Sequence, residues 1–266
     1  LAAHFQLFFS VCPCQAMFND PNQLAFFLFM MILLLYLYRC RFGDRSFPVF
    51  YVLALPVIAA SKSTGILLGV LIFTVLAVLH ALYRVGCRKG VSMKVWTLGI
   101  VIGVVLFGLF LWWIWPAADF DVKTVDYNML TRIQEKIWKV AHGGLLGLFL
   151  DRGMEKLVLY PQYLLYGAGE GGFDRFTLAS QVNEIHCCLF SVMFCYGLIP
   201  TLCLLVWLGR KLRYADAAMA CAVMGLLAES FFLVNYRQPM FWMILLYGSV
   251  VRMDGDGERT SIPVAE

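Results

Sequence analysis

Long apolar runs separated by short polar or basic segments are the feature that most limits what this chain can fold into. A helix of about 20 apolar residues can cross the roughly 30 Å of hydrocarbon in a bilayer. Hydrophobic residues fill 61% of the 266 positions and charged residues only 14%, too few charges to cover a soluble domain of this size. The sequence therefore predicts an all-α integral membrane protein with about seven transmembrane helices. The predicted spans are 22–38, 47–60, 64–83, 96–115, 186–208, 215–234 and a shorter run at 239–251.

Basic residues gather in alternate loops and predict how the chain is oriented in the membrane. Loops rich in Arg and Lys stay in the cytoplasm. One orientation places all three basic loops there, and it puts the segment 116–185 and the turns at 61–64 and 235–237 on the opposite, external face. The basic groups are Arg39, Arg41 and Arg45; Arg84, Arg88, Lys89 and Lys94; and Arg210, Lys211 and Arg213.

The chain divides into a polytopic membrane domain, residues 1–251, and a polar tail, residues 252–266, which we expect to be cytoplasmic and disordered. Within the domain, residues 116–185 form a large external loop with acids and bases in nearly equal numbers. Apolar residues recur every three or four positions from Leu130 to Ala141, which predicts an amphipathic helix in this loop. Loops of this length are more often functional than simple connectors.

Four basic or titratable side chains fall on the predicted external face: Lys62, Arg152, His186 and Arg237. Arginine binds phosphate through a bidentate fork and lysine binds it as a point charge. Histidine titrates near neutrality and commonly accepts the proton of a hydroxyl. Together they predict an anion-binding cleft with a base at its edge. The alternatives are headgroup anchoring for Lys62 and Arg237 and a backbone-bonded helix start for His186.

Three other patterns have both a functional and a structural interpretation. Gly167–Gly172 has the glycine spacing of a dinucleotide-binding loop, but no βαβ unit surrounds it, so it predicts a tight loop between helices. Asp119 and Asp121 form a D-x-D that can hold a divalent cation against a diphosphate, or are ordinary acids after a helix. Glu229 lies inside a predicted span and is a candidate functional carboxylate. The structural alternatives are a neutral carboxyl or a pair with Arg237, and we expect the pair.

The nine cysteines lie mostly inside apolar runs, where we expect them to pack as small hydrophobic residues. Neither Cys12 and Cys14 nor Cys187 and Cys188 have the spacing of a common zinc or redox site. An odd total argues against a framework of disulfides.

Several short motifs occur in a fixed order between residues 19 and 208 and share the predicted external face. They are Asn19–Ala25, Ser61–Gly65, Arg152 ahead of Tyr160–Pro161, Tyr166–Phe173, and Glu184–His186 followed by Tyr196–Ile199. This order resembles the C-terminal half of the O-antigen ligase and polymerase family, membrane glycosyltransferases that use undecaprenyl-diphosphate-linked glycans. A full member has several more N-terminal helices. Since the chain begins at Leu1 rather than Met, we expect it to be truncated at its N-terminus.

The resemblance implies a metal-independent, inverting glycosyl transfer at the periplasmic face of the bacterial inner membrane, without a cofactor. Lys62 and Arg152, with Arg237 as a third, would bind the diphosphate, where negative charge develops as it leaves. His186 would act as the base or orient the acceptor hydroxyl. The implied partners are the undecaprenyl-diphosphate-linked donor, a lipid A core or glycan acceptor and the lipid bilayer, with no nucleic acid. Ligase and polymerase differ only in the acceptor, so both remain open.

Two departures from the family pattern bear on this expectation. The family usually has arginine where this chain has Lys62, and asparagine or serine near the positions of Cys187 and Cys188. The main alternative is a transporter or flippase of an anionic or lipid-linked substrate, which would use broken helices and polar groups such as Glu229 inside the membrane. A non-catalytic subunit of a polysaccharide assembly complex is a further alternative.

Overall fold

All regular structure in the described part of the chain is helical. The computed structural model describes residues 18, 20–43, 45–89, 112–116, 129–179 and 184–256, with isolated positions between 95 and 109, and no strand occurs among them. The all-α prediction is thus confirmed for these residues. Most of the predicted span 96–115 lies outside them.

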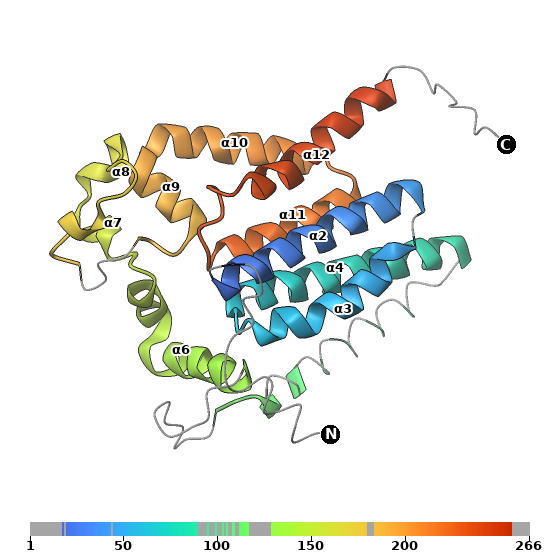
Figure 1. The fold of residues 1–266 in the computed structure, drawn as a ribbon, viewed down its shortest axis with the longest axis horizontal. Helices are drawn as coiled ribbons and strands as arrows, with labels where there is room; N and C mark the ends of the chain where they lie inside the picture. The colour runs from blue at the N-terminus through green and yellow to red at the C-terminus, as the bar shows by residue number, and fades with distance from the viewer. Residues whose placement is uncertain are drawn as a thin grey trace.

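Two of the described helices are long and apolar enough to cross a membrane: α2 (Pro21–Phe42) and the Thr64–Cys87 part of α4 (Thr64–Lys89). The helices α3 (Ser46–Ala60) and α11 (Ala217–Ser230) are apolar but shorter. These four helices lie alongside one another as a bundle (Figure 1). The predicted number of about seven transmembrane helices is not confirmed.

Local sequence signals explain where α2 begins and ends. The Asp20 carboxylate accepts a hydrogen bond from the backbone N–H of Asn22 at 2.9 Å, and Pro21 occupies the first turn, where its missing N–H costs nothing. The helix ends at Gly43, whose φ of 75° suits glycine and whose N–H donates to Arg39 O at 2.8 Å.

Small residues allow α4 and α11 to pack closely at the centre of the bundle. A Cβ atom on Gly69 would lie 2.6 Å from Cβ of Glu229, and one on Gly225 would lie 2.6 Å from Cβ of Phe73. Neither contact is possible for a larger residue without a shift of the helices. Close backbone approach at small residues is typical of helix packing in membranes.

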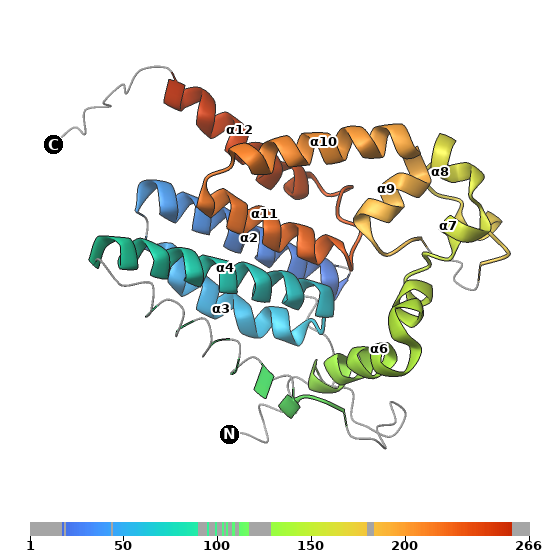
Figure 2. The same cartoon turned by 180° about the vertical axis from the view of Figure 1, so that it is seen from behind.

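The connections between helices divide between the two ends of the bundle. The α2–α3 turn, the C-terminal end of α4 and the connection from α10 (Leu198–Tyr214) to α11 lie at one end, on the right in Figure 1 and on the left in Figure 2. These are the segments that carry the basic residues. The α3–α4 turn and the end of α11 lie at the opposite end, which is the arrangement that the alternating charge pattern predicts.

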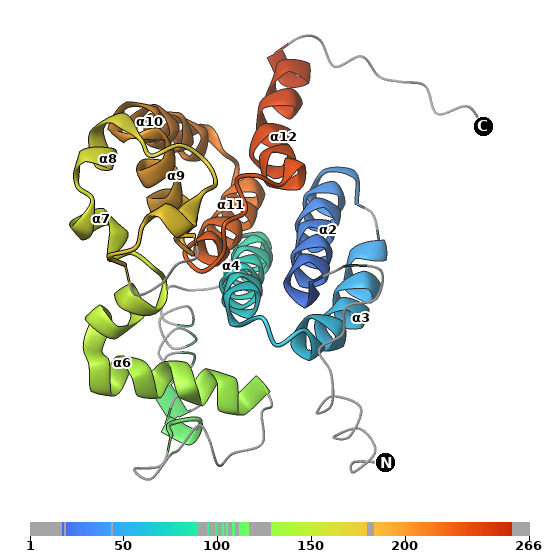
Figure 3. The ribbon, with the colours of Figure 1, turned by 60° about the vertical axis from the view of Figure 1, so that its left-hand side comes forward.

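Residues 186–208, predicted as one span, form two helices. The helix α9 (Cys188–Tyr196) ends at Gly197, where φ is 87° and ψ is 178°, and α10 continues in another direction (Figure 3). Gly197 adopts this conformation because its backbone packs directly on the carbonyl of Leu165. Pro200 also prevents a continuous helix through this point, because it has no N–H to donate to Tyr196 O, so local sequence and tertiary contact both interrupt the apolar run.

The helices of the predicted external loop lie at the end of the bundle that holds the α3–α4 turn (Figure 3). The helix α6 (Met129–Asp151) confirms the predicted helix in this loop and bends at Gly144, where φ is 61°. It is followed by the short helices α7 (Lys156–Leu159) and α8 (Gln162–Tyr166) and a 3₁₀ turn, η1 (Phe173–Arg175).

The last helix, α12 (Pro239–Asp256), runs past the predicted domain boundary at position 251. Residues 257–266 lie outside the described part of the chain, so the prediction of a disordered cytoplasmic tail stays a prediction.

Candidate functional site

Phe232, two residues after the end of α11, joins two of the segments that carry predicted site residues. Nη1 of Arg152 donates a hydrogen bond to Phe232 O at 2.8 Å, and its guanidinium carbon lies 5.0 Å from the centre of the Phe232 ring. The same side chain packs on the first turn of α4, since a Cβ on Gly65 would lie 2.7 Å from Phe232 Cβ. Arg152 and the start of α4, next to Lys62, thus contact one phenylalanine.

Lys62 lies in a strained, buried turn between α3 and α4. Among the described residues it alone is a non-glycine with positive φ, at 58°, and its exposed fraction is 9%. Ser61 supports the turn: its hydroxyl donates to Ile58 O at 2.6 Å and accepts from the backbone N–H of Ser63 at 3.3 Å. A left-handed conformation costs a non-glycine residue about 1–2 kcal/mol, and such strain clusters at functional sites.

His186 is held beside Arg152 by the backbone. Its N–H donates to Arg152 O at 3.0 Å, which fixes the start of α9 against the segment that follows α6. The residue is half-buried and lies two positions before the first residue of α9. A positive electrostatic potential at this helix end favours negative charge nearby.

Arg237 forms ion pairs with Glu170 and Glu184. Its Nη2 also donates to the Tyr236 hydroxyl at 3.2 Å. The expected pairing between Arg237 and Glu229 is wrong. The helix α11 ends at Ser230, so the chain turns before Arg237, and the fully buried Glu229 carboxylate instead accepts hydrogen bonds from Nδ2 of Asn235.

Glu170 is the functional candidate that sequence reasoning missed. It accepts a hydrogen bond from the Tyr236 hydroxyl in addition to the ion pair with Arg237. Burial raises the pKa of Glu170, but hydrogen bonding from Tyr236 and the charge of Arg237 outweigh it and hold this pKa below its ordinary value. Burial and the bond to Glu170 in turn raise the pKa of Tyr236. The available signal was the position of Glu170 in the middle of the glycine-rich loop.

The glycine-rich loop docks onto the end of α9, which confirms the interpretation of Gly167–Gly172 as a tight loop between helices. The N–H groups of Ala168 and Gly169 donate to the carbonyls of Phe194 and Cys195 at 2.7 and 2.8 Å. These carbonyls end a helix and would otherwise lack partners. The loop therefore caps α9 and brings Glu170 to Tyr236 and Arg237.

The four predicted residues come from distant parts of the sequence and gather at one end of the bundle. Arg152 contacts Phe232, which also packs on the first turn of α4 at Gly65, and the backbone N–H of His186 is bonded to Arg152 O. Arg237 is bonded to Glu184, two residues before His186. The arrangement places the Arg152 guanidinium at Phe232, just after α11, next to segments that carry Lys62 and His186, and Arg237 is already bound by carboxylates.

Replacing Gly197 with alanine should destabilise the docked loop strongly. A Cβ there would lie 2.5 Å from Leu165 O, and the backbone has φ and ψ values that only glycine adopts easily. We expect a loss of about 2–4 kcal/mol, combining backbone strain and overpacking. Thermal unfolding of the purified protein measures the loss. Gly171→Ala is the matched control, since φ is 76° there but no atom lies within 4 Å of the added Cβ. Equal losses of stability in Gly197→Ala and Gly171→Ala would contradict the close contact between Gly197 and Leu165.

Acid should release the glycine-rich loop. A carboxylate with a depressed folded-state pKa stabilises the fold above its unfolded pKa of about 4.3, and this contribution is lost as the pH falls through the folded-state value. Because Glu170 has such a depressed pKa, the protection of the Ala168 and Gly169 amides, measured as exchange relative to the intrinsic rate at each pH, should fall below about pH 4. Glu170→Gln should exchange faster at neutral pH and lose that acid step. An unchanged acid step in Glu170→Gln would assign it to another group.

Metal binding cannot be assigned within the described residues, where no group of three or more His, Cys, Asp or Glu side chains is arranged around a common point. Asp119 and Asp121 lie outside the described residues, so the D-x-D interpretation stays a prediction.

No protein-family model, curated protein or solved structure matches the chain. The resemblance to the O-antigen ligase and polymerase family therefore rests on the motifs alone.

Proposed function

We propose that the protein is a multi-pass glycosyltransferase of the bacterial inner membrane that moves an oligosaccharide from a polyprenyl diphosphate to an acceptor hydroxyl at the periplasmic face. The observation that carries the proposal is the convergence around Phe232. Arg152 and the first turn of α4, which follows Lys62 in the chain, contact this residue, and the backbone N–H of His186 is bonded to Arg152 O. The α3–α4 turn, the end of α6 and the start of α9, which carry or adjoin these residues, lie at the end of the bundle opposite the basic loops (Figures 1 and 2).

In the proposed reaction, the acceptor oxygen forms a bond to the anomeric carbon of the donor sugar. The bond from that carbon to the diphosphate oxygen breaks, and its electron pair leaves with the polyprenyl diphosphate. A single displacement of this kind inverts the anomeric configuration. Arg152 and Lys62 stabilise the negative charge that develops on the leaving group, and His186 takes the proton of the acceptor hydroxyl.

Arg237 has a different role in this proposal from the one that the sequence suggests. Diphosphate binding by Arg237 would compete with two carboxylates that already bind its guanidinium. Hydrogen bonds to charged groups contribute about 1.5–3 kcal/mol when buried and less when partly exposed, as here. We propose that Arg237 positions Glu184, and through it the start of α9 with His186.

Two observations favour the transporter alternative. The break between α9 and α10 at Gly197 and the buried Glu229 within α11 are features that transporters use to bind substrates inside the membrane. Glycosyl transfer and substrate movement yield different products, so one reconstitution separates them.

The test is a reconstitution of the protein in liposomes with a polyprenyl-diphosphate-linked oligosaccharide and an acceptor glycan. We expect a new glycosidic product and free polyprenyl diphosphate. Lys62→Arg keeps the charge, so its transfer rate should stay within a few-fold of the parent rate. Lys62→Met keeps only the aliphatic part of the side chain, so its transfer rate should fall by about 10²–10³-fold. Movement of the donor across the bilayer without any product would replace this proposal by the transporter.

Deletion of the gene followed by gel profiling of surface glycans separates the two acceptors. Loss of chain length with single repeats still attached indicates a polymerase. Loss of attachment indicates a ligase.

A further inference from the structure

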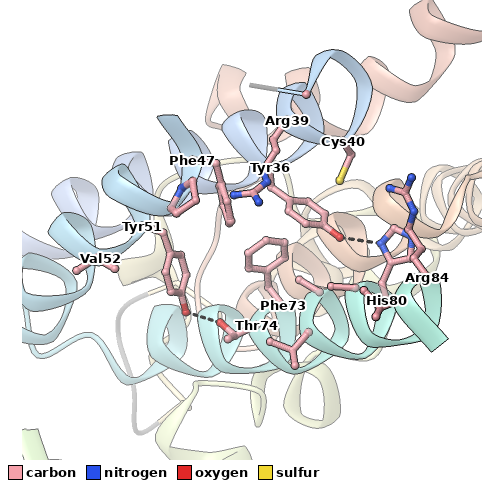
Figure 4. Close-up of a pocket in the computed structure, with 16 residues that line it drawn as sticks. Tyr36, Arg39, Cys40, Phe47, Tyr51, Val52, Phe73, Thr74, His80 and Arg84 are labelled. Atoms are coloured by element: carbon pink, nitrogen blue, oxygen red, sulfur yellow. Dashed lines mark hydrogen bonds between the residues drawn. The ribbon is translucent and has the colours of Figure 1, made fainter. Parts of the chain in front are cut away.

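A groove between α2, α3 and α4 lies at the basic end of the bundle, away from the candidate site (Figure 4). It exists because α3 packs mainly on α2 and touches α4 little. Its volume is about 610 Å³, within the range of small-molecule sites in proteins.

The walls of the groove are mainly apolar. Phe47, Val52, Phe73 and Val78 line it, and Val52 and Val78 are exposed, at 65% and 51%. The groove is therefore open on the side of the helices that would face lipid.

The polar side chains inside the groove already bond to each other. The Tyr36 hydroxyl lies 3.0 Å from Nδ1 of His80, and the Tyr51 hydroxyl lies 2.6 Å from Oγ1 of Thr74 (Figure 4). Since these groups satisfy one another, the interior suits a hydrocarbon chain better than a sugar or a nucleotide.

The charge of the groove is positive. Arg39 and Arg84 line it, both are exposed, and Figure 4 shows them on α2 and α4 respectively. The Arg39 guanidinium lies 5.8 Å from the centre of the Phe47 ring, a cation–π contact that orients it. No acidic residue is among the described residues that line the groove. This end of the bundle also carries the other basic loops, which predict contact with the anionic cytoplasmic leaflet.

We propose that this groove binds one anionic phospholipid. An acyl chain lies along Phe47, Phe73 and Val78, and the headgroup phosphate is bound between Arg39 and Arg84. This lipid site is separate from the transfer site and depends only on the chain lying in a membrane. Failure of the lipid proposal would therefore leave the proposed function untouched.

Native mass spectrometry of the detergent-purified protein with phosphatidylglycerol or phosphatidylcholine tests the proposal. We expect a preference for phosphatidylglycerol on the order of 10- to 30-fold, the size expected for two arginines near one phosphate. Arg39→Gln with Arg84→Gln should abolish the preference, and the double lysine variant should keep most of it. Arg41→Gln with Arg45→Gln is the control, since it removes equal charge from the same end but outside the groove.

A second variant tests the acyl chain. Val78→Trp should fill the groove and weaken binding of both lipids about tenfold. In a separate competition experiment, glycerol phosphate, which has no acyl chain, should not displace phosphatidylglycerol from the parent protein. Equal binding of the two lipids, equal losses in the control, or normal lipid binding by Val78→Trp would each overturn the proposal. Displacement by glycerol phosphate would assign the site to a free phosphate compound.

Discussion

Replacing His186 with alanine is expected to lower the rate of glycan transfer by about 10²–10⁴-fold, the contribution of a general base to such a reaction. The protein should still fold and insert, because the hydrogen bond that fixes this residue to Arg152 uses its backbone N–H and not its ring. Initial rates at saturating donor and acceptor, with gel filtration of the same preparations, measure both properties.

His142 provides a matched control for this substitution. It is exposed on α6, its ring stacks on Trp138 at 4.4 Å, and its Nδ1 is 3.0 Å from Trp138 O. His142→Ala should therefore leave transfer unchanged. Full activity in His186→Ala would remove the base from the mechanism, and equal losses in both variants would indicate a general effect on folding.

Arg152→Ala should reduce transfer by about 10²–10³-fold, because the charge on the leaving diphosphate loses a fixed cation. Arg152→Lys should recover part of the rate, since a lysine supplies the charge but not the planar fork. Arg152 also bonds to Phe232 O, so both variants should melt at a lower temperature than the parent protein. If Arg152→Lys recovers transfer while its melting temperature stays as low as that of Arg152→Ala, the rate depends on the charge and the stability on the packing at Phe232.

Arg41 is the control for Arg152, because it too lies over a phenylalanine ring, at 5.7 Å from the centre of Phe42, but at the opposite end of the bundle. Arg41→Ala should transfer at the parental rate. Unchanged transfer in Arg152→Ala would exclude this guanidinium as a diphosphate ligand.

Apolar runs and charge clusters were enough to predict that the chain is helical and that the basic connections lie at one end. Both depend on local composition: α2 has a capping Asp20, a proline in its first turn and a glycine at its end. The basic groups alternate along the chain, so their placement at one end follows from the order of the helices.

The contacts within the candidate site could not be predicted in the same way. Phe232 joins Arg152 to the start of α4 although the three are far apart in sequence, and nothing in a single apolar run indicates that contact. The pairing of Glu229 with Arg237 was inferred from helical spacing, which stops applying where α11 ends at Ser230.

Gly197 is a second case in which a tertiary contact could not be predicted from the sequence. Gly197 and Pro200 are local signals for a helix break within this apolar run, but nothing in the run indicates the contact between Gly197 and Leu165. Sequence patterns predicted which segments are helical but not where tertiary packing interrupts them.

The account depends on one electrostatic premise: the cations and the imidazole share a single aqueous face, opposite the basic loops. Single cysteines at Thr64, Arg152 and His186 in a cysteine-free background, labelled in spheroplasts with a membrane-impermeant reagent, test it most directly. We expect all three to react from outside, whereas cysteines at Arg84 and Lys211 react only after the membrane is opened. Labelling of the first three positions from different sides would contradict a common diphosphate site.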